Sequence, residues 1–207
     1  MSGINLKQGV YGGTFDPMHR GHLKIIKESI CQLGLDVLYV VVSGDSWMKK
    51  NNVVASRQQR QKMAEITLNN HAKICLVNVE ISKNSPSYSY QTLEYLKDKN
   101  KKADFYFIMG ADSVMNMDKW KNPLNILCSS KIVCVPRNNI SNQNVKDKLL
   151  KIYPHAQVQF LRNIDEKISS TSIRNLIKRN KSQQEYLNKK MYALCRSNNI
   201  NGINVNK

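Results

Sequence analysis

Two histidines stand three residues apart, shortly after a pair of glycines. His19 and His22 follow Gly12 and Gly13 in the stretch GVYGGTFDPMHRGHL, residues 9–23. Apolar residues recur at helical spacing from the end of this stretch, so a helix is predicted to begin there. Glycine lets backbone N–H groups approach a ligand closely, and the N-terminus of a helix attracts anions. The two imidazoles share a face if the helix begins near the second of them. The stretch therefore predicts a phosphate site with two imidazole donors.

A metal site is the weaker interpretation of His19 and His22. Neither cysteine nor carboxylate stands beside them at ligand spacing, and protein metal sites generally combine such partners. Two ordinary surface histidines are a further alternative. We therefore predict no metal site made of protein ligands.

A second stretch, ISSTSIR at residues 168–174, combines hydroxyls with an arginine. Ser170 or Thr171 is predicted to cap a helix that begins at Ser172. Arg174 lies three positions after Thr171, so the two side chains share a surface on which a guanidinium can make forked contacts to phosphate. Taken alone, the stretch is better explained as an ordinary capped helix. Together with the first stretch, it indicates a second phosphate contact.

A candidate nucleoside site follows the strand predicted at residues 104–109. Gly110 and Asp112 stand at its end, and Trp120 follows shortly after them. A carboxylate at a strand end can accept hydrogen bonds from ribose hydroxyls. Indole offers a flat apolar face to an aromatic ring, although core packing is the alternative role for this tryptophan.

Strands and helices alternate along the chain. Strands are predicted at residues 6–11, 37–42, 74–79, 104–109, 131–135 and 157–161. This alternation predicts an α/β fold with a Rossmann-like, doubly wound parallel sheet, which binds ligands beyond the carboxyl ends of its strands. We expect one domain over residues 1–207, made of a core at 1–165 and a helical part at 166–197 that carries the second phosphate stretch.

Composition and charge narrow the class of protein. The chain has 207 residues, 41% hydrophobic content and a formal net charge of +17. Such a basic balance favours anionic partners, among which nucleotides are preferred here to nucleic acid because aromatic residues do not interleave with a basic stripe. The five cysteines are scattered and include no CxxC pair, which is typical of reduced thiols in a cytosol-like compartment. The sequence shows no secretory leader and no membrane span, so we expect a cytoplasmic protein without a membrane partner.

The string GGTFDPMHRGH closely resembles the signature of the HxGH-type nucleotidyltransferases. Within that superfamily it looks most like the nicotinate/nicotinamide mononucleotide adenylyltransferases, and the stretch PSYSYQTL at residues 86–93 resembles a substrate loop of that family. The resemblance implies adenylyl transfer from ATP to nicotinate mononucleotide or nicotinamide mononucleotide. The products would be deamido-NAD or NAD and pyrophosphate, and Mg²⁺ would be bound mainly through the phosphates of ATP.

The same resemblance assigns the candidate residues to the two substrates. The catalytic residues that it implies are His19, His22 and Arg174. The implied contacts to ATP come from Gly12, Gly13, Thr14, Phe15, His22, Gly110, Asp112, Ser170, Thr171 and Arg174. The implied contacts to the mononucleotide come from Thr14, Phe15, His19, Lys49, Tyr88, Thr92 and Trp120.

One part of the chain departs from the family pattern. Bacterial relatives usually carry Pro-Pro-His-Lys after the second strand, whereas this chain reads SWMKK at residues 46–50. Lys49 or Lys50 can supply the positive charge, and the sequence does not choose between them; the role of Trp47 is also open. A pantetheine-phosphate adenylyltransferase or a cytidylyltransferase is the alternative within the superfamily. A basic, non-catalytic nucleic-acid-binding protein is the alternative from another class. The sequence decides neither between nicotinate and nicotinamide nor between a monomer and a homodimer.

Overall fold

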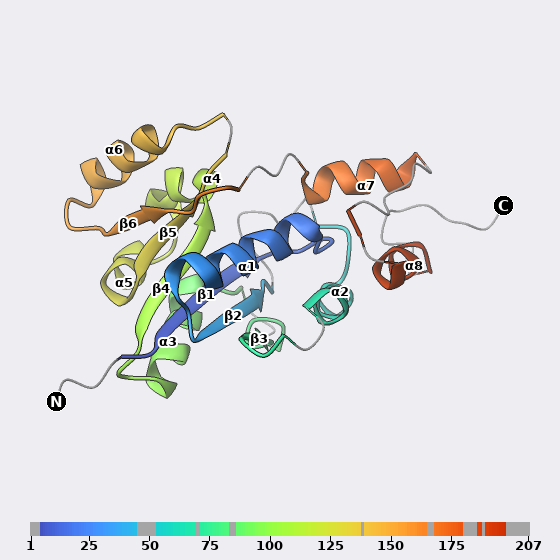
Figure 1. Ribbon diagram of the computed structural model, residues 1–207, viewed down its shortest axis with the longest axis horizontal. Helices are drawn as coiled ribbons and strands as arrows, with labels where there is room; N and C mark the ends of the chain where they lie inside the picture. The colour runs from blue at the N-terminus through green and yellow to red at the C-terminus, as the bar shows by residue number, and fades with distance from the viewer. Residues whose placement is uncertain are drawn as a thin grey trace. The chain divides into compact units, whose positions relative to one another are not determined.

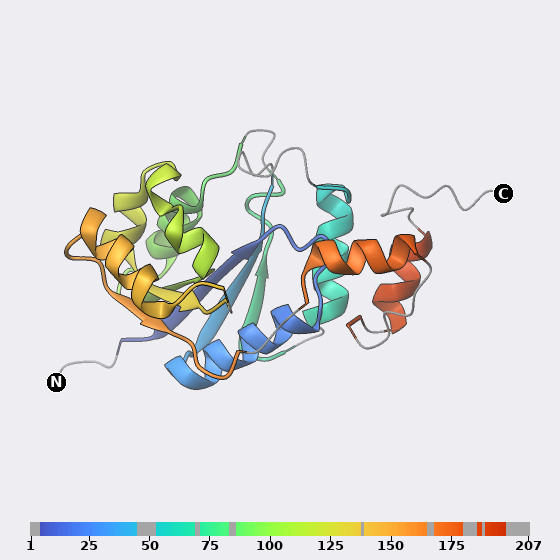
Figure 2. The same cartoon turned by 90° about the horizontal axis from the view of Figure 1, so that it is seen from above.

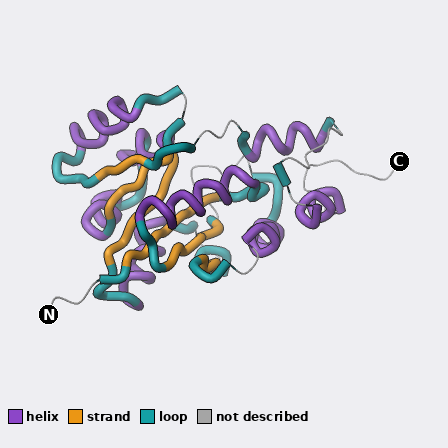
Figure 3. Tube along the Cα trace, viewed as in Figure 1, coloured by secondary structure: helices purple, strands orange, loops and turns teal. Residues whose placement is uncertain are grey.

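The computed structural model describes residues 5–44, 53–68, 71–82, 86–137, 139–164, 168–179, 186–187 and 189–197. Helices and strands alternate along this part of the chain (Figure 3). In chain order the elements are β1 (Lys7–Gly13), α1 (Arg20–Leu33), β2 (Val37–Val42), α2 (Arg57–Leu68), β3 (Ile74–Val77), α3 (Ser89–Lys99), β4 (Asp104–Gly110), α4 (Ala111–Met115), η1 (Met117–Lys119), α5 (Pro123–Ser129), β5 (Lys131–Val135), α6 (Asn142–Ile152), β6 (Val158–Phe160), α7 (Ser170–Lys178) and α8 (Lys189–Ser197).

The strands form one six-stranded sheet in the order β3-β2-β1-β4-β5-β6. The pairs β1–β4, β4–β5 and β5–β6 run parallel, and Val10 of β1 is opposite Phe107 of β4. In this order the chain leaves β1 in one direction and later resumes on its other side at β4, which creates the topological switch point of a doubly wound sheet. The predicted fold class is therefore confirmed, and all strand boundaries agree with prediction to within two residues. The third strand ends at Val77 instead of residue 79.

The chain divides into two compact units. The first contains Met1–Gly12, Ile25–Val40 and Tyr88–Asp165, and the second contains Gly13–Lys24, Val41–Ser87 and Glu166–Lys207.

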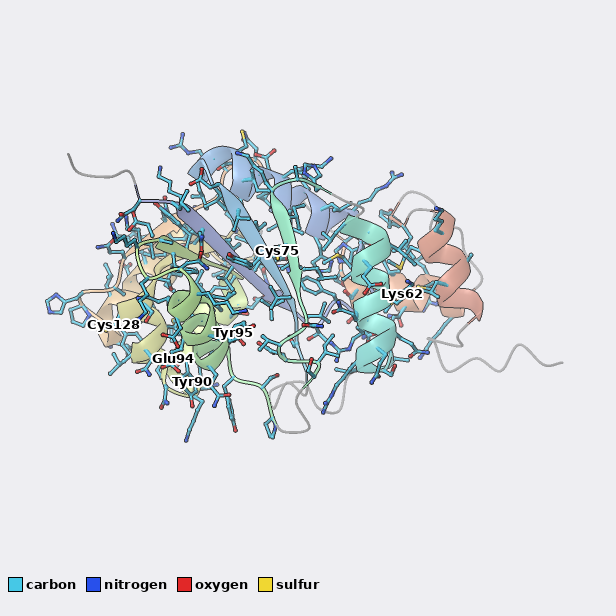
Figure 4. The ribbon with its side chains drawn as sticks, turned by 90° about the horizontal axis from the view of Figure 1, so that it is seen from below. Lys62, Cys75, Tyr90, Glu94, Tyr95 and Cys128 are labelled. Atoms are coloured by element: carbon cyan, nitrogen blue, oxygen red, sulfur yellow. The ribbon has the colours of Figure 1, made fainter. Side chains whose placement is uncertain are left out.

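The first unit is built on β1, β4, β5 and β6, whose central strands are apolar on both faces. Phe105 to Met109 of β4 and Ile132 to Val135 of β5 are all buried. Helices cover these strands; α4 packs on α6 and α3 packs on α5 (Figure 1). Asn125 of α5 donates a 2.9 Å hydrogen bond to Glu94 of α3, which Figure 4 labels together with its neighbours Tyr90 and Tyr95. Strands buried on both faces are the reason that these segments appear in the sequence as continuous apolar runs.

The second unit holds an apolar cluster between α2, α7 and α8, which lie together in Figure 2. Met63 from α2 and Ile173 and Ile177 from α7 contribute to this cluster. The last helix adds Met191 and Cys195, and the Cys195 thiol lies 3.8 Å from the sulfur of Met63. The helix that carries the second phosphate stretch is therefore anchored by hydrophobic contacts on its inner face.

All five cysteines are free thiols, as predicted. Cys31, Cys75 and Cys128 are exposed, and Figure 4 labels the last two; Cys134 and Cys195 are buried. In the part of the chain that the structure describes, no helix combines the length and the apolar character that a membrane crossing requires.

Candidate active site

The loop after β1 is shaped by the ring of Phe15. Its backbone has a φ of 50°, in the left-handed region, and its side chain is buried. A Cβ atom on Gly13 would lie 2.6 Å from Cε1 of this ring, closer than atoms can approach, whereas one on Gly12 would meet nothing within 4 Å. Gly13 is therefore required by the packing of the loop itself. Gly12 instead leaves open space beside the backbone, which a ligand can enter.

His19 and His22 lie together at the start of α1. Their ring centroids are 3.7 Å apart, and the His19 carbonyl accepts the N–H of His22 at 2.9 Å, so the predicted shared face is confirmed. The backbone N–H of His19 donates to Nδ1 of His22 at 3.1 Å. Because Nδ1 is an acceptor there, the neutral His22 imidazole carries its proton on Nε2. The structure thus holds this ring as a donor through Nε2.

The second phosphate stretch begins α7, but its cap differs from the prediction. Ser169 is the N-cap, and its Oγ accepts the N–H of Ser172 at 3.1 Å. The predicted caps, Ser170 and Thr171, are the first two residues of the helix. The Ser170 hydroxyl instead donates to the carbonyl of Pro17 at 2.9 Å. This contact within the second unit joins the two phosphate stretches through residues that are 153 positions apart in the chain.

Arg174 makes a second link between the two stretches. Its Nη1 donates to the backbone carbonyl of Asp16 at 2.6 Å and lies 3.6 Å from the carboxylate oxygen Oδ2 of the same residue. Its Nη2 donates to Thr171 Oγ1 at 3.2 Å, as the three-residue spacing predicts. These contacts direct the guanidinium toward the loop that carries the two histidines.

Asp16 is a functional candidate that the sequence reasoning missed. The residue is only 2% exposed, and its carboxylate accepts the N–H groups of Val54 at 2.8 Å and Ala55 at 3.1 Å. With the contact to Arg174, this carboxylate joins three segments of the second unit. A buried carboxylate needs such partners, because an unpaired charge is costly to remove from water. The Asp-Pro dipeptide suggests only a local turn, so sequence alone gave no signal of this role.

The candidate nucleoside residues lie in the first unit. Gly110 ends β4, and Asp112 is an exposed residue in the first turn of α4. Its carboxylate lies 3.8 Å from Nε of Arg137, and both side chains are largely open to solvent. A pair so exposed contributes little to stability, and with 64% of its side chain exposed Asp112 is accessible to a hydroxyl donor.

Trp120 follows η1, and its ring meets Phe107 edge to face with centroids 6.3 Å apart. Its indole Nε1 is buried and has no hydrogen-bond partner among the described residues. Its backbone N–H already donates to the carbonyl of Met117 at 3.0 Å. The edge contact with Phe107 helps to fix the plane of the indole, and the backbone N–H of Trp120 is already used within the fold.

The PSYSYQTL stretch leads into α3, which begins at Ser89. Tyr88 directly precedes the helix, and its ring stacks on that of Tyr90 at 6.1 Å. Thr92 is buried in the first turn, with 4% of its surface exposed. The predicted Lys49, with Trp47 and Lys50, lies outside the described residues.

Comparisons with known proteins agree with this architecture. Residues 10–176 match the model of the family described as cytidylyltransferase-like. The chain is 34% identical to the probable nicotinate-nucleotide adenylyltransferase of Clostridium novyi (strain NT), over 94% of this chain and 98% of that one. The chain belongs to the nicotinate-nucleotide adenylyltransferases, within the cytidylyltransferase-like family. The probable nicotinate-nucleotide adenylyltransferase of Flavobacterium johnsoniae is also 34% identical, with the same coverage of both chains.

Solved structures of other adenylyltransferases share the fold of this chain. The nicotinic acid mononucleotide adenylyltransferase of Plasmodium falciparum complexed with NaAD has a TM-score of 0.78 at 20% identity, covering 97% of this chain and 100% of that one. The structure of that enzyme complexed with APC has a TM-score of 0.75 at the same identity and coverage. At this identity the likeness supports the fold, and it agrees with the family resemblance inferred from GGTFDPMHRGH.

Most of the predicted phosphate-binding residues lie in the second unit: Gly13, Thr14, Phe15, His19, His22, Ser170, Thr171 and Arg174. The other described candidates lie in the first unit: Gly12, Tyr88, Thr92, Gly110, Asp112 and Trp120. Among the residues that the structure describes, no three His, Cys, Asp or Glu side chains gather in a way that could hold a metal ion. Besides Asp16, sequence reasoning missed the buried Arg60 and Glu80, which contact the backbone after β1 and β2.

Proposed function

We propose that this chain transfers the adenylyl group of ATP to the 5′-phosphate of nicotinate mononucleotide, with deamido-NAD and pyrophosphate as products. The observation that carries the proposal is the joining of the two phosphate stretches by Ser170 and Arg174, which contact Pro17 and Asp16. The family membership and the names of the relatives support the same reaction. In this proposal His19, His22 and Arg174 are the catalytic residues.

Adenylyl transfer requires little covalent chemistry from the protein. An oxygen of the mononucleotide phosphate attacks the α-phosphorus of ATP, and the bond to the bridging oxygen breaks as pyrophosphate leaves. The phosphate dianion is already a nucleophile, so no side chain has to remove a proton. The protein must bring two anions together and stabilise the charge that develops on the transferred group.

His22 is suited to that stabilisation, because its Nδ1 is occupied by the His19 N–H and its proton is therefore on Nε2. We assign this N–H to an oxygen of the α-phosphate, and the His19 ring, 3.7 Å away, to the incoming phosphate. Arg174 donates to Asp16 and Thr171 and has further N–H groups for the leaving pyrophosphate, because a guanidinium carries five donors. Gly12, Gly13, Thr14, Phe15, Ser170 and Thr171 complete the proposed surroundings of the phosphates.

Mg²⁺ is the proposed cofactor, and it supplies charge neutralisation between the phosphate oxygens when it is bound. The residues present fit an ion carried by the nucleotide. Asp16, the carboxylate within the signature, is committed to Val54, Ala55 and Arg174. The side chains that hold the triphosphate, Arg174 and Thr171, would therefore hold the ion indirectly.

The residues of the first unit are assigned to the nucleoside parts of the substrates. Asp112 and Gly110 would contact the ATP ribose, and Trp120 would stack on the pyridine ring. Tyr88 and Thr92 of this unit would also contact the mononucleotide, together with Thr14, Phe15, His19 and Lys49 from outside it. We propose that the chain works as one nucleotidyltransferase domain in the cytoplasm, and gel filtration would decide whether it does so as a homodimer.

The test is pyrophosphate release with ATP and Mg²⁺ in the presence of nicotinate mononucleotide, nicotinamide mononucleotide or phosphopantetheine. We expect the highest kcat/KM with nicotinate mononucleotide and no release from the double variant H19A/H22A. Release with phosphopantetheine alone would keep the chemistry but contradict the proposed acceptor. Folded protein that binds RNA in a salt-sensitive way and releases no pyrophosphate would contradict the proposed function altogether.

A further inference from the structure

Arg60 is one of the largest fully buried side chains of the chain. It lies on α2 and is 2% exposed. Lys62, two residues further along the same helix, is exposed and forms a 3.2 Å surface ion pair with Glu65 (Figure 4). Arginine is rarely buried unless its guanidinium finds partners, so the contacts of this side chain indicate why the helix carries it.

The guanidinium of Arg60 donates to three backbone carbonyls in the second unit. Nη1 donates to Thr14 at 2.9 Å and to Ser43 at 2.6 Å, and Nη2 donates to Gly44 at 3.1 Å. The first carbonyl directly follows the glycine pair that ends β1, and the other two follow β2. Backbone groups beyond the ends of strands lose their ladder partners, and one planar side chain with several donors can satisfy them together.

The peptide between Ser43 and Gly44 is held from both sides. Its carbonyl accepts from Arg60, and its N–H, on Gly44, donates to the Glu80 carboxylate at 3.4 Å. Gly44 also has no room for a side chain, because a Cβ atom there would overlap the backbone carbonyl oxygen of Glu80. The N–H of Ser43 donates to the carbonyl of Gly13 at 2.9 Å, so this fixed peptide is adjacent to the end of β1, where the loop with the two histidines begins.

The peptide between Thr14 and Phe15 takes its orientation from the same guanidinium. The carbonyl and the N–H of a trans peptide point in opposite directions. Because the Thr14 carbonyl points to Arg60, the Phe15 N–H points away from it. A change at Arg60 would therefore allow this peptide to rotate within the loop that we assign to the phosphates.

We propose that Arg60 is a positioning residue for adenylyl transfer. From inside the fold it sets the direction of backbone groups in the loop between β1 and α1, which we assign to the phosphates. This inference rests on the function proposed above. Small displacements of groups that orient reacting phosphates can reduce rates by about 100-fold, so we expect the main effect in kcat.

The test compares R60K with wild type in the pyrophosphate-release assay. Lysine keeps the charge but has no planar fork to reach three carbonyls. We expect R60K to lose at least 30-fold in kcat per mole of folded protein, with the KM for nicotinate mononucleotide within threefold of wild type. K62A, which removes a cation from the solvent side of the same helix, is the control and should keep both parameters.

A second variant distinguishes positioning from general support of the fold. R60A opens a space for guanidinium ion, which we expect to restore at least tenfold of the lost kcat at non-denaturing concentrations, whereas urea at equal concentration should restore none. Folded R60K with wild-type kcat would overturn the inference, and so would R60A that regains its folded fraction in guanidinium without regaining kcat. Inactive wild-type protein would instead refute the proposed function.

Discussion

The imidazole of His22 has two roles that substitutions can separate: Nδ1 accepts a hydrogen bond within the fold, and Nε2 is the proposed donor to the substrate. Nδ1 accepts the backbone N–H of His19 at 3.1 Å, and the proton on Nε2 is the proposed donor to the transferred phosphate. Asparagine can place an acceptor near the position of Nδ1, and glutamine can place an N–H near the position of Nε2. The variants H22N, H22Q and H22A therefore remove the donor, the acceptor and both groups, respectively.

The magnitudes follow from one donor and one acceptor. Loss of a single donor to a developing anionic charge typically reduces kcat by about 10²–10³. If His22 loses its acceptor, the backbone N–H of His19 loses this hydrogen bond. The loss lowers the free energy of unfolding by about 1–3 kcal/mol. For a chain of this size that cost lowers Tm by roughly 2–10 °C.

We expect H22N to keep the wild-type Tm but lose about 10²–10³ in kcat. H22Q should lose stability but retain a larger share of kcat, and H22A should lose both. Differential scanning calorimetry gives the first quantity, and pyrophosphate release at saturating ATP and mononucleotide gives the second. Equal kcat values for H22N and H22Q would refute the assignment of the proton to Nε2, and an effect of H22A on KM alone would refute a role in the transition state.

Further predictions test the loop, the stacking residue and the buried thiols. G13A should lower the free energy of unfolding by about 1–3 kcal/mol because its Cβ collides with the ring of Phe15. G12A should unfold like wild type in urea but raise the KM for ATP. Equal losses of stability in the two variants would contradict the different roles of the two glycines. W120A should raise the KM for the mononucleotide about 5- to 100-fold, as expected for lost stacking, and equal losses for both substrates would indicate a packing role. Burial raises the pKa of the Cys134 and Cys195 thiols from 9.0 to about 12, so their contribution to stability is complete below pH 9 and is lost as the pH rises toward 12. Urea unfolding across this range should show the decline, and C195A should make it shallower; an unchanged slope would refute the effect.

The alternation of elements and the pairing of the histidines could be predicted from sequence because both depend on local spacing. The N-cap of α7 could not be predicted in the same way. Ser169, Ser170 and Thr171 offer three adjacent hydroxyls, each of which is a competent cap. The tertiary contact of Ser170 with Pro17 accompanies a register in which Ser169 is the cap, and no local pattern reveals that contact.

The buried charges were hidden for a different reason. Arg60 lies in a helix rich in polar residues, where a cation normally indicates the solvent face. Only the burial of that position and the carbonyls around it show that the guanidinium acts inside the fold. The role of Asp16 was hidden because its partners at residues 54–55 are distant in the chain.

The apolar cluster around Met63 and Cys195 limits how far the chain can be shortened. None of the residues that we assign to the reaction lies in α8, yet this helix covers the inner side of α7 and α2. A recombinant version that stops before Lys189 would expose the apolar faces of α7 and α2, and we expect it to precipitate or be degraded in the host cell. The last helix must therefore be retained even in a minimal enzyme.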